Sequence, residues 1–311
     1  MGSAQVKLLR GDYISTFPQP DYKLFKHNTK KWMEQIDDDR YISSLTIPGT
    51  HQSLSRQGGY MKVITVAQCQ SWSIEDQLNA GIRSFDLRGK CRQNGAQFSA
   101  YHGIVDQKMD IKSIFPVFYK FLDENPSEFI VIFIKEEKKG VSDEVLTNMF
   151  DTMIQETHRE KYWCIQENIP KVKQVRGKIF FIPRWKYATR FRLVRYQDCY
   201  NIEPKQKLKE IENFRIQTLQ SVDADIGQTL FINYLSGSTY KNWPLTYALK
   251  TNKQFYQNCI SRGIIMIDFP GEKLIDTIIG LCLQSANCKN ESSLFRVYRA
   301  LKSFKKEQQL A

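Results

Sequence analysis

The chain of 311 residues lacks any apolar segment long enough to cross a membrane. A transmembrane helix needs about 20 consecutive apolar residues, and every apolar run here is interrupted by polar or charged residues well before that length. The N-terminal residues Met1 to Lys7 are not followed by the apolar stretch of a signal peptide either. We therefore expect a soluble chain, although a secreted protein in its mature form would look the same.

Paired cysteines and internal repeats are also missing. The seven cysteines are odd in number and scattered, and none forms a CxxC pair. This pattern indicates reduced thiols in a cytoplasmic compartment and argues against a zinc site. We expect neither a metal nor an organic cofactor.

Acidic residues are fewer than basic ones: 33 Asp and Glu stand against 45 Lys and Arg, giving a net charge of +12. The electrostatic field of this positive net charge favours binding to polyanions or to an anionic lipid surface. Basic residues are dense at about 291–307, where Leu294, Val297, Leu301 and Phe304 share one face of a predicted amphipathic helix. That helix either packs on its own domain or lies in a membrane interface, and both alternatives stay open.

The composition is that of a globular protein, with 41% hydrophobic and 25% charged residues. A length of 311 residues fits two average domains or one α/β barrel of roughly 250 residues with extensions. Because nothing in the composition divides the chain, we expect an irregular N-terminal arm over residues 1–28 and one domain over 29–311.

Short apolar runs alternate with amphipathic stretches about seven or eight times, which predicts parallel strands joined by helices. Nearly every run ends on a polar residue. In an open sheet only the strands at one switch point would do so, and therefore we predict a single distorted TIM barrel. The side chains expected at these strand ends are His51, Asp86, Arg88, His102, Lys135, Arg184 and Asp268.

Helical segments are predicted from the spacing of apolar residues. A short helix is expected from Asn28, burying Trp32, Met33 and Ile36. Further helices are expected over 111–122 with Pro116 in the first turn, over 143–156, and over 253–262.

Two histidines and several cations at neighbouring strand ends predict a specific chemistry. A lone histidine there would merely cap a strand, but two permit one general base and one general acid. Arg88, Lys135 and Arg184 would hold and neutralise a phosphate without a metal. This combination suits cleavage of a phosphodiester.

Seven motifs occur in order between about Trp32 and Pro270: Ile47-Pro48-Gly49-Thr50-His51, Gln70-Ser71-Trp72-Ser73-Ile74 with Gln77-Leu78, Asp86-Leu87-Arg88-Gly89, Tyr101-His102-Gly103, Asn125-Pro126-Ser127-Glu128, Ser236-Gly237-Ser238 and Met266-Ile267-Asp268-Phe269-Pro270. In this order they resemble the X-type catalytic domain of phosphatidylinositol-specific phospholipase C, particularly the small metal-independent bacterial enzymes. The resemblance implies a distorted TIM barrel and a phosphatidylinositol-type lipid, rather than nucleic acid, as the partner at an anionic membrane. The oligomeric state stays open.

The resemblance also implies a role for each residue. His51 would be the base for the inositol 2-hydroxyl, Asp268 would orient it, and His102 would protonate the departing diacylglycerol oxygen. Arg88 would stabilise the transition state. The expected contacts to the inositol ring are Lys135, Arg184, Asp198 and Tyr200.

One position departs from the family pattern. The family commonly has Asp directly after the first histidine, where it serves the general acid, and this chain has Gln52. A neutral amide stabilises an imidazolium less than a carboxylate does, so the pKa of His102 is expected to be lower than usual. Asp86 is the alternative partner for His102.

The sequence suggests three alternative functions. The first is a phosphodiesterase that cleaves phosphatidylinositol, or a glycosylated form, to diacylglycerol and inositol 1,2-cyclic phosphate by metal-independent acid–base catalysis. The alternative is a catalytically weakened inositol-lipid-binding or scaffold protein on the same barrel. The third, a barrel phosphodiesterase acting on glycerophosphodiesters or sphingomyelin, would use acidic metal ligands, and Arg88 argues against it.

Overall fold

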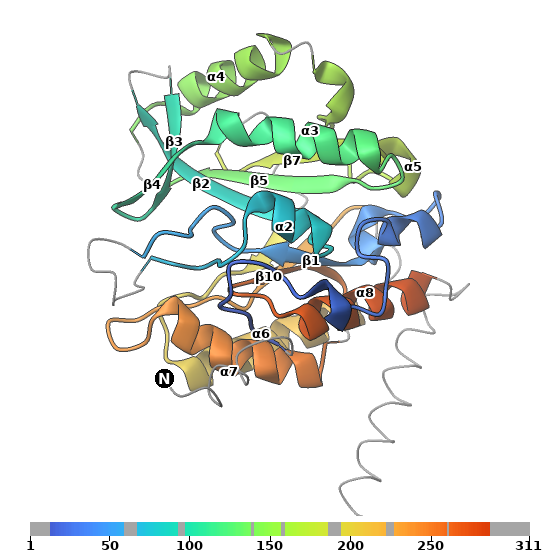
Figure 1. The fold of residues 1–311 in the computed structure, drawn as a ribbon, viewed down its shortest axis with the longest axis vertical. Helices are drawn as coiled ribbons and strands as arrows, with labels where there is room; N and C mark the ends of the chain where they lie inside the picture. The colour runs from blue at the N-terminus through green and yellow to red at the C-terminus, as the bar shows by residue number, and fades with distance from the viewer. Residues whose placement is uncertain are drawn as a thin grey trace, which may run out of the picture.

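A curled parallel β-sheet forms the centre of the computed structural model (Figure 1). The structure describes residues 13–58, 67–92, 97–137, 140–156, 159–185, 194–221, 227–259 and 261–286. The strands lie in the order β6-β7-β5-β2-β1-β10-β9-β8, and every neighbouring pair is parallel. The bounds are β1 Thr46–Thr50, β2 Ser84–Arg92, β5 Ile130–Glu136, β6 Trp163–Cys164, β7 Ile179–Pro183, β8 Val194–Gln197, β9 Leu230–Tyr234 and β10 Gly263–Ile267.

The predicted distorted barrel is confirmed. The first strand, β1, pairs with both β2 and the last strand, β10, as closure of a barrel requires. Within the described ranges no pairing joins β6 to β8, so the wall is open there. The strands are apolar along their length because side chains on both faces are buried, as in Ile130–Ile134 of β5.

Helices cover the outside of the sheet. In Figure 1, α3 and α4 lie above the strands β2, β5 and β7, and α6, α7 and α8 lie below β10. The helix bounds are α2 Ile74–Asn79, α3 Phe115–Glu124, α4 Asp143–Glu156, α5 Val172–Val175, α6 Pro204–Gln220, α7 Pro244–Gln257 and α8 Glu272–Ala286. The 3-10 turns are η1 Tyr22–Leu24, η2 Trp32–Gln35, η3 Ile42–Ser44, η5 Ile111–Ile114 and η6 Glu160–Tyr162.

The run that ends on His102 is not a barrel strand, which corrects our reading of it as another unit of the parallel repeat. It is β3 (Gln97–His102), and it pairs antiparallel with both β2 and β4 (Val105–Asp110). β2 is nine residues long and extends past its barrel neighbours, so the chain folds back on it. Gly103, with φ +56, makes the turn that follows His102.

Three predicted helices differ in extent from the structure. The segment after Asn28 is the 3-10 turn η2. Arg83 donates hydrogen bonds to the carbonyl oxygens of Thr29 and Lys30, which an α-helix would use as acceptors for its own N–H groups. The stretch 111–122 divides into η5 and α3, with Pro116 in the first turn of α3 as predicted. The helix expected over 253–262 begins earlier and ends at Gln257.

The described part of the N-terminal arm packs on the barrel domain. Ile14 is buried and forms an antiparallel bridge with Pro270, and the backbone N–H groups of Lys26 and His27 donate to Asp276 of α8. The basic helix predicted at 291–307 lies outside the described residues. No helix within the described ranges is long and apolar enough to span a bilayer.

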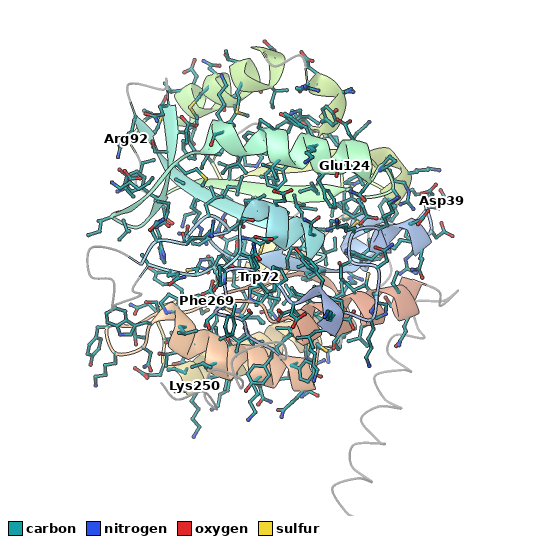
Figure 2. All side chains as sticks on the ribbon, in the orientation of Figure 1. Asp39, Trp72, Arg92, Glu124, Lys250 and Phe269 are labelled. Carbon is teal, nitrogen blue, oxygen red and sulfur yellow. The ribbon has the colours of Figure 1, made fainter. Side chains whose placement is uncertain are left out.

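A buried ion pair joins the amino-terminal ends of the strands. Arg83 and Glu128 are both fully buried, and Arg83 Nη2 lies 2.8 Å from Glu128 Oε2. The guanidinium also donates to the carbonyl oxygens of Leu78 and Ile82, and Met33 N–H donates to the Glu128 carboxylate. By contrast, Figure 2 shows Asp39, Arg92 and Lys250 at the periphery, whereas Trp72 and Phe269 lie near the middle of the molecule.

We expect Arg83→Met to lower the free energy of unfolding by about 3–5 kcal/mol, because it leaves the Glu128 carboxylate buried without its cation. Urea denaturation measures the loss. The control is Lys120→Met, which removes an exposed pair with Glu124 and should cost less than ~1 kcal/mol. A loss below ~1 kcal/mol for Arg83→Met would contradict this account.

Candidate active site

The register of β1 and β10 places His51 beside Asp268. Thr50 is the partner of Ile267, so the next residue of each strand emerges at the same end of the barrel. His51 Nδ1 lies 2.8 Å from Asp268 Oδ1, and the two side chains are 12% and 1% exposed. Gln70 Nε2 donates to the carbonyl oxygens of both His51 and Ile267, which fixes the two strand ends. Because a carboxylate accepts, the Nδ1–H donates and Nε2 keeps a lone pair.

His102 faces His51 from the β3–β4 hairpin. The ring centroids lie 6.4 Å apart and the planes are nearly perpendicular, at 86°. His102 Nδ1 lies 2.8 Å from the carbonyl oxygen of Ala67. A carbonyl oxygen only accepts, so the proton is on Nδ1 and Nε2 is left to exchange a proton with a ligand.

Three cations come from the ends of neighbouring strands. Arg88 Nε donates to Asp86 Oδ2 at 2.8 Å, and Arg88 pairs with Lys135 of β5 in the sheet register. Arg184, which follows β7, donates to Asp198 at 3.4 Å and to the Tyr234 hydroxyl at 3.1 Å. Arg88 Nη2 is 4.0 Å from the same Asp198 carboxylate. The site is therefore a cluster of oriented cations beside two imidazoles.

Burial and charge shift the proton affinities of this cluster. Burial lowers the pKa of His51 well below its usual value, and the positive charge of Arg88 lowers it further. Burial also lowers the pKa of His102, although the bond to the Ala67 carbonyl and the charge of Glu137 oppose that shift. Burial alone would raise the pKa of Asp86, but Arg88, Arg184 and Lys135 together outweigh burial and the pKa is lowered. Both imidazoles are thus neutral near pH 7, and Asp86 is ionised.

Comparison with known proteins decides the family. The 1-phosphatidylinositol phosphodiesterase of Listeria monocytogenes is 31% identical over 284 residues, covering 81% of this chain and 84% of that protein. The chain belongs to the phosphatidylinositol-specific phospholipase C family. Residues 45–184 match the family model described as phosphatidylinositol-specific phospholipase C, X domain.

Solved structures of this phospholipase C family share the fold. The phosphatidylinositol-specific phospholipase C from Listeria monocytogenes matches with a TM-score of 0.69 at 27% identity, over 82% of this chain and 99% of that one. A Staphylococcus aureus phosphatidylinositol-specific phospholipase C, from a study of its membrane binding, matches with a TM-score of 0.70 at 20% identity, over 81% and 97%.

The structure brings together eight of the nine residues that the sequence singled out. Contacts or sheet register connect His51, Asp268, His102, Asp86, Arg88, Lys135, Arg184 and Asp198. Tyr200 follows two residues after Asp198, and its side chain is mostly exposed, at 63%. Tyr200 is therefore not one of the buried residues of this cluster.

Gln52 forms no hydrogen bond with His102. Its backbone has φ 46, and its amide donates a short hydrogen bond to the Glu137 carboxylate, which lies 3.7 Å from Arg88 Nη1. Asp86 Oδ2 accepts from Arg88, and no hydrogen bond joins Asp86 to His102. The negative charge of Asp86 nevertheless raises the pKa of His102, so our alternative partner acts on that histidine through its charge and not as its hydrogen-bond partner. The Ala67 carbonyl takes that place.

Sequence reasoning missed three residues of this site. Glu137 lies one residue past β5, and the run of charged residues Lys135-Glu136-Glu137 at the end of that strand is a pattern from which it could have been predicted. Tyr234 ends β9, and its ring meets His51 edge-on at a centroid distance of 5.7 Å. Cys69 is fully buried, and its Sγ lies 3.7 Å from His102 Nδ1. Nothing in the sequence marked Cys69, because its neighbours come from distant segments.

Proposed function

We propose that this chain cleaves phosphatidylinositol, or a glycosylated form of it, to diacylglycerol and inositol 1,2-cyclic phosphate by metal-independent general acid–base catalysis. The observation that carries the proposal is the His51–Asp268 pair facing His102 across 6.4 Å, with Arg88 beside them. Membership of the phospholipase C family supports the choice of lipid. This arrangement favours an active enzyme over the scaffold alternative.

Each proton has a definite route in the proposed reaction. Neutral His51 accepts the proton of the inositol 2-hydroxyl at Nε2, and the freed oxygen attacks phosphorus. The Asp268 carboxylate stabilises the imidazolium that forms. The P–O bond to diacylglycerol breaks, and His102, which carries a proton on both ring nitrogens once the phosphodiester is bound, delivers its Nε2 proton to the departing oxygen. The lowered pKa of His51 keeps the base unprotonated before the reaction.

The cations hold the phosphate and the ring. Arg88, kept in place by Asp86, faces the phosphoryl oxygens and offsets the charge that develops in the transition state. Lys135, Arg184 and Asp198 contact the inositol hydroxyls, with the exposed ring of Tyr200 packing against the sugar from the rim. These fixed charges supply what a metal ion would give in a calcium-dependent relative.

Two exposed hydrophobic side chains belong to loops that adjoin residues of the proposed site. Ile104, two residues after His102, is 90% exposed, and Tyr240 is 84% exposed. The loop of Tyr240 lies beside Tyr200, because Ser238 N–H donates to the Tyr200 carbonyl. These exposed hydrophobic side chains, together with the chain's net charge of +12, fit docking on an anionic membrane surface, where phosphatidylinositol resides.

We expect His51→Ala and His102→Ala each to lower turnover of phosphatidylinositol at least ~100-fold, the lower scale for losing a general acid or base. Phosphorus NMR of the products identifies the cyclic phosphate. Tyr22→Phe, at an exposed position in the N-terminal arm, is the control. Near-wild-type turnover in a folded histidine variant would remove that residue from the mechanism, and an inactive wild type would favour the scaffold alternative.

The pH profile of kcat/KM should be bell-shaped and centred on the acidic side of pH ~6.5. The base is active above its pKa and the acid below its pKa, and burial lowers both values. Two variants should move the alkaline limb of the profile in opposite directions. Gln52→Asp adds a negative charge and should move this limb to higher pH by roughly one unit, whereas Glu137→Gln removes one and should move it to lower pH. A limb that stays in place in both variants would show that neither carboxylate position influences His102.

Replacing Ile104 and Tyr240 together by Asp should weaken binding to vesicles that contain anionic lipid at least ~10-fold, because burial of each apolar side chain contributes about 1.5–3 kcal/mol. Sedimentation with vesicles measures the change. Leu249→Asp, at a partly exposed position on α7, controls for added negative charge. Equal losses in the control and the rim variant would assign the effect to charge alone.

A further inference from the structure

Cys69 occupies a position behind the two histidines that the proposed reaction does not use. Its Sγ, His51 Nδ1 or Nε2 and a carboxylate oxygen of Asp268 all lie within 4.8 Å of one another. His102 Nδ1 is 3.7 Å from the same sulfur. The side chains of Cys69 and Asp268 are buried, and the side chain of His51 is 12% exposed.

This donor set matches one class of metal ion. Thiolate, imidazole and carboxylate are the ligands of Zn²⁺, with bond lengths of about 2.3 Å to sulfur and about 2.0–2.2 Å to nitrogen and oxygen. In a tetrahedral site these donors therefore stand roughly 3.3–3.6 Å apart. The present separations of up to 4.8 Å would have to contract by about 1 Å when the metal binds. Mg²⁺ and Ca²⁺ require mostly oxygen ligands and do not fit.

We propose that His51, Cys69 and Asp268 form an inhibitory site for a thiophilic divalent cation such as Zn²⁺. Water or His102 would complete the coordination. A metal needs the lone pair of His51 Nδ1, so the imidazole proton moves to Nε2, and the Cys69 thiol releases its proton to solvent. Nε2 is then no longer able to accept the proton of a hydroxyl.

The inhibition rests on the proposed function, because it acts through the base that we assign to His51. Zinc binding itself does not depend on that function. Burial raises the pKa of Cys69 well above its usual value, so the thiol is uncharged without metal, and a coordinated cation deprotonates it. The chain thus combines a metal-independent reaction with a metal-sensitive base.

The binding experiment uses the full chain and zinc in competition with a chromogenic chelator. We expect one site per chain, and Cys69→Ser should weaken it at least ~100-fold, the upper end of what losing even a second-layer partner of a metal site costs. The matched control is Cys199→Ser, because Cys199 is exposed and would be the obvious surface thiol for zinc. Co²⁺ provides a spectroscopic readout: its thiolate charge-transfer absorption should vanish in Cys69→Ser and persist in the control.

The activity experiment adds zinc to each protein and compares the rate with that protein's own rate in EDTA. The wild type and Cys199→Ser should be inhibited and should recover with EDTA, whereas Cys69→Ser should need at least ~100-fold more zinc. Equal zinc affinity in Cys69→Ser and wild type would overturn the site. Cys69-dependent binding without inhibition would overturn its inhibitory role. A wild type that binds zinc but never turns over lipid would refute the proposed function and leave the metal site standing.

Discussion

The parallel pairing of β1 with β10 is the constraint on which the site depends. It joins the first strand of the barrel to the last, and its register sets Thr50 against Ile267. The next residues, His51 and Asp268, are 217 positions apart in the sequence and yet only 2.8 Å apart. No local segment of the chain makes this pair. Pairing of the first barrel strand with the last is therefore a condition for the orientation of His51, the proposed base, and the hydrogen bonds between these two strands contribute to that orientation.

The same geometry concentrates charge at one end of the barrel. Parallel strands bring Arg88, Lys135 and Arg184 to neighbouring positions, where their mutual repulsion would be large in a buried setting. Asp86, Asp198 and Glu137 offset that repulsion through contacts of 2.7–4.0 Å. These carboxylates also hold the guanidinium groups in fixed directions. The cations are thus oriented before any phosphate arrives, which is the arrangement that lowers the cost of stabilising a developing charge.

Features that follow from strand patterns were predictable, and features that follow from long-range contacts were not. Apolar runs ending on polar residues identified the barrel and most of the site, because the carboxyl ends of parallel strands meet. The run before His102 has the same local pattern as a barrel strand, and only its pairing with the overhanging end of β2 distinguishes it. Similarly, the 3-10 turn at Trp32 depends on Arg83, about fifty residues later, and the partner of Gln52 is Glu137.

The support of His102 by a backbone carbonyl has a consequence for the order of events. The Ala67 carbonyl orients the ring, but it carries no net charge and therefore stabilises an imidazolium less than a carboxylate would. Glu137 contributes negative charge while it also offsets Arg88. In the proposed reaction the phosphate of the lipid adds a further negative charge near His102, beside those of Glu137 and Asp86. Binding of the phosphodiester raises the proton affinity of His102, so the acid becomes charged chiefly when the leaving oxygen that needs its proton is already in place.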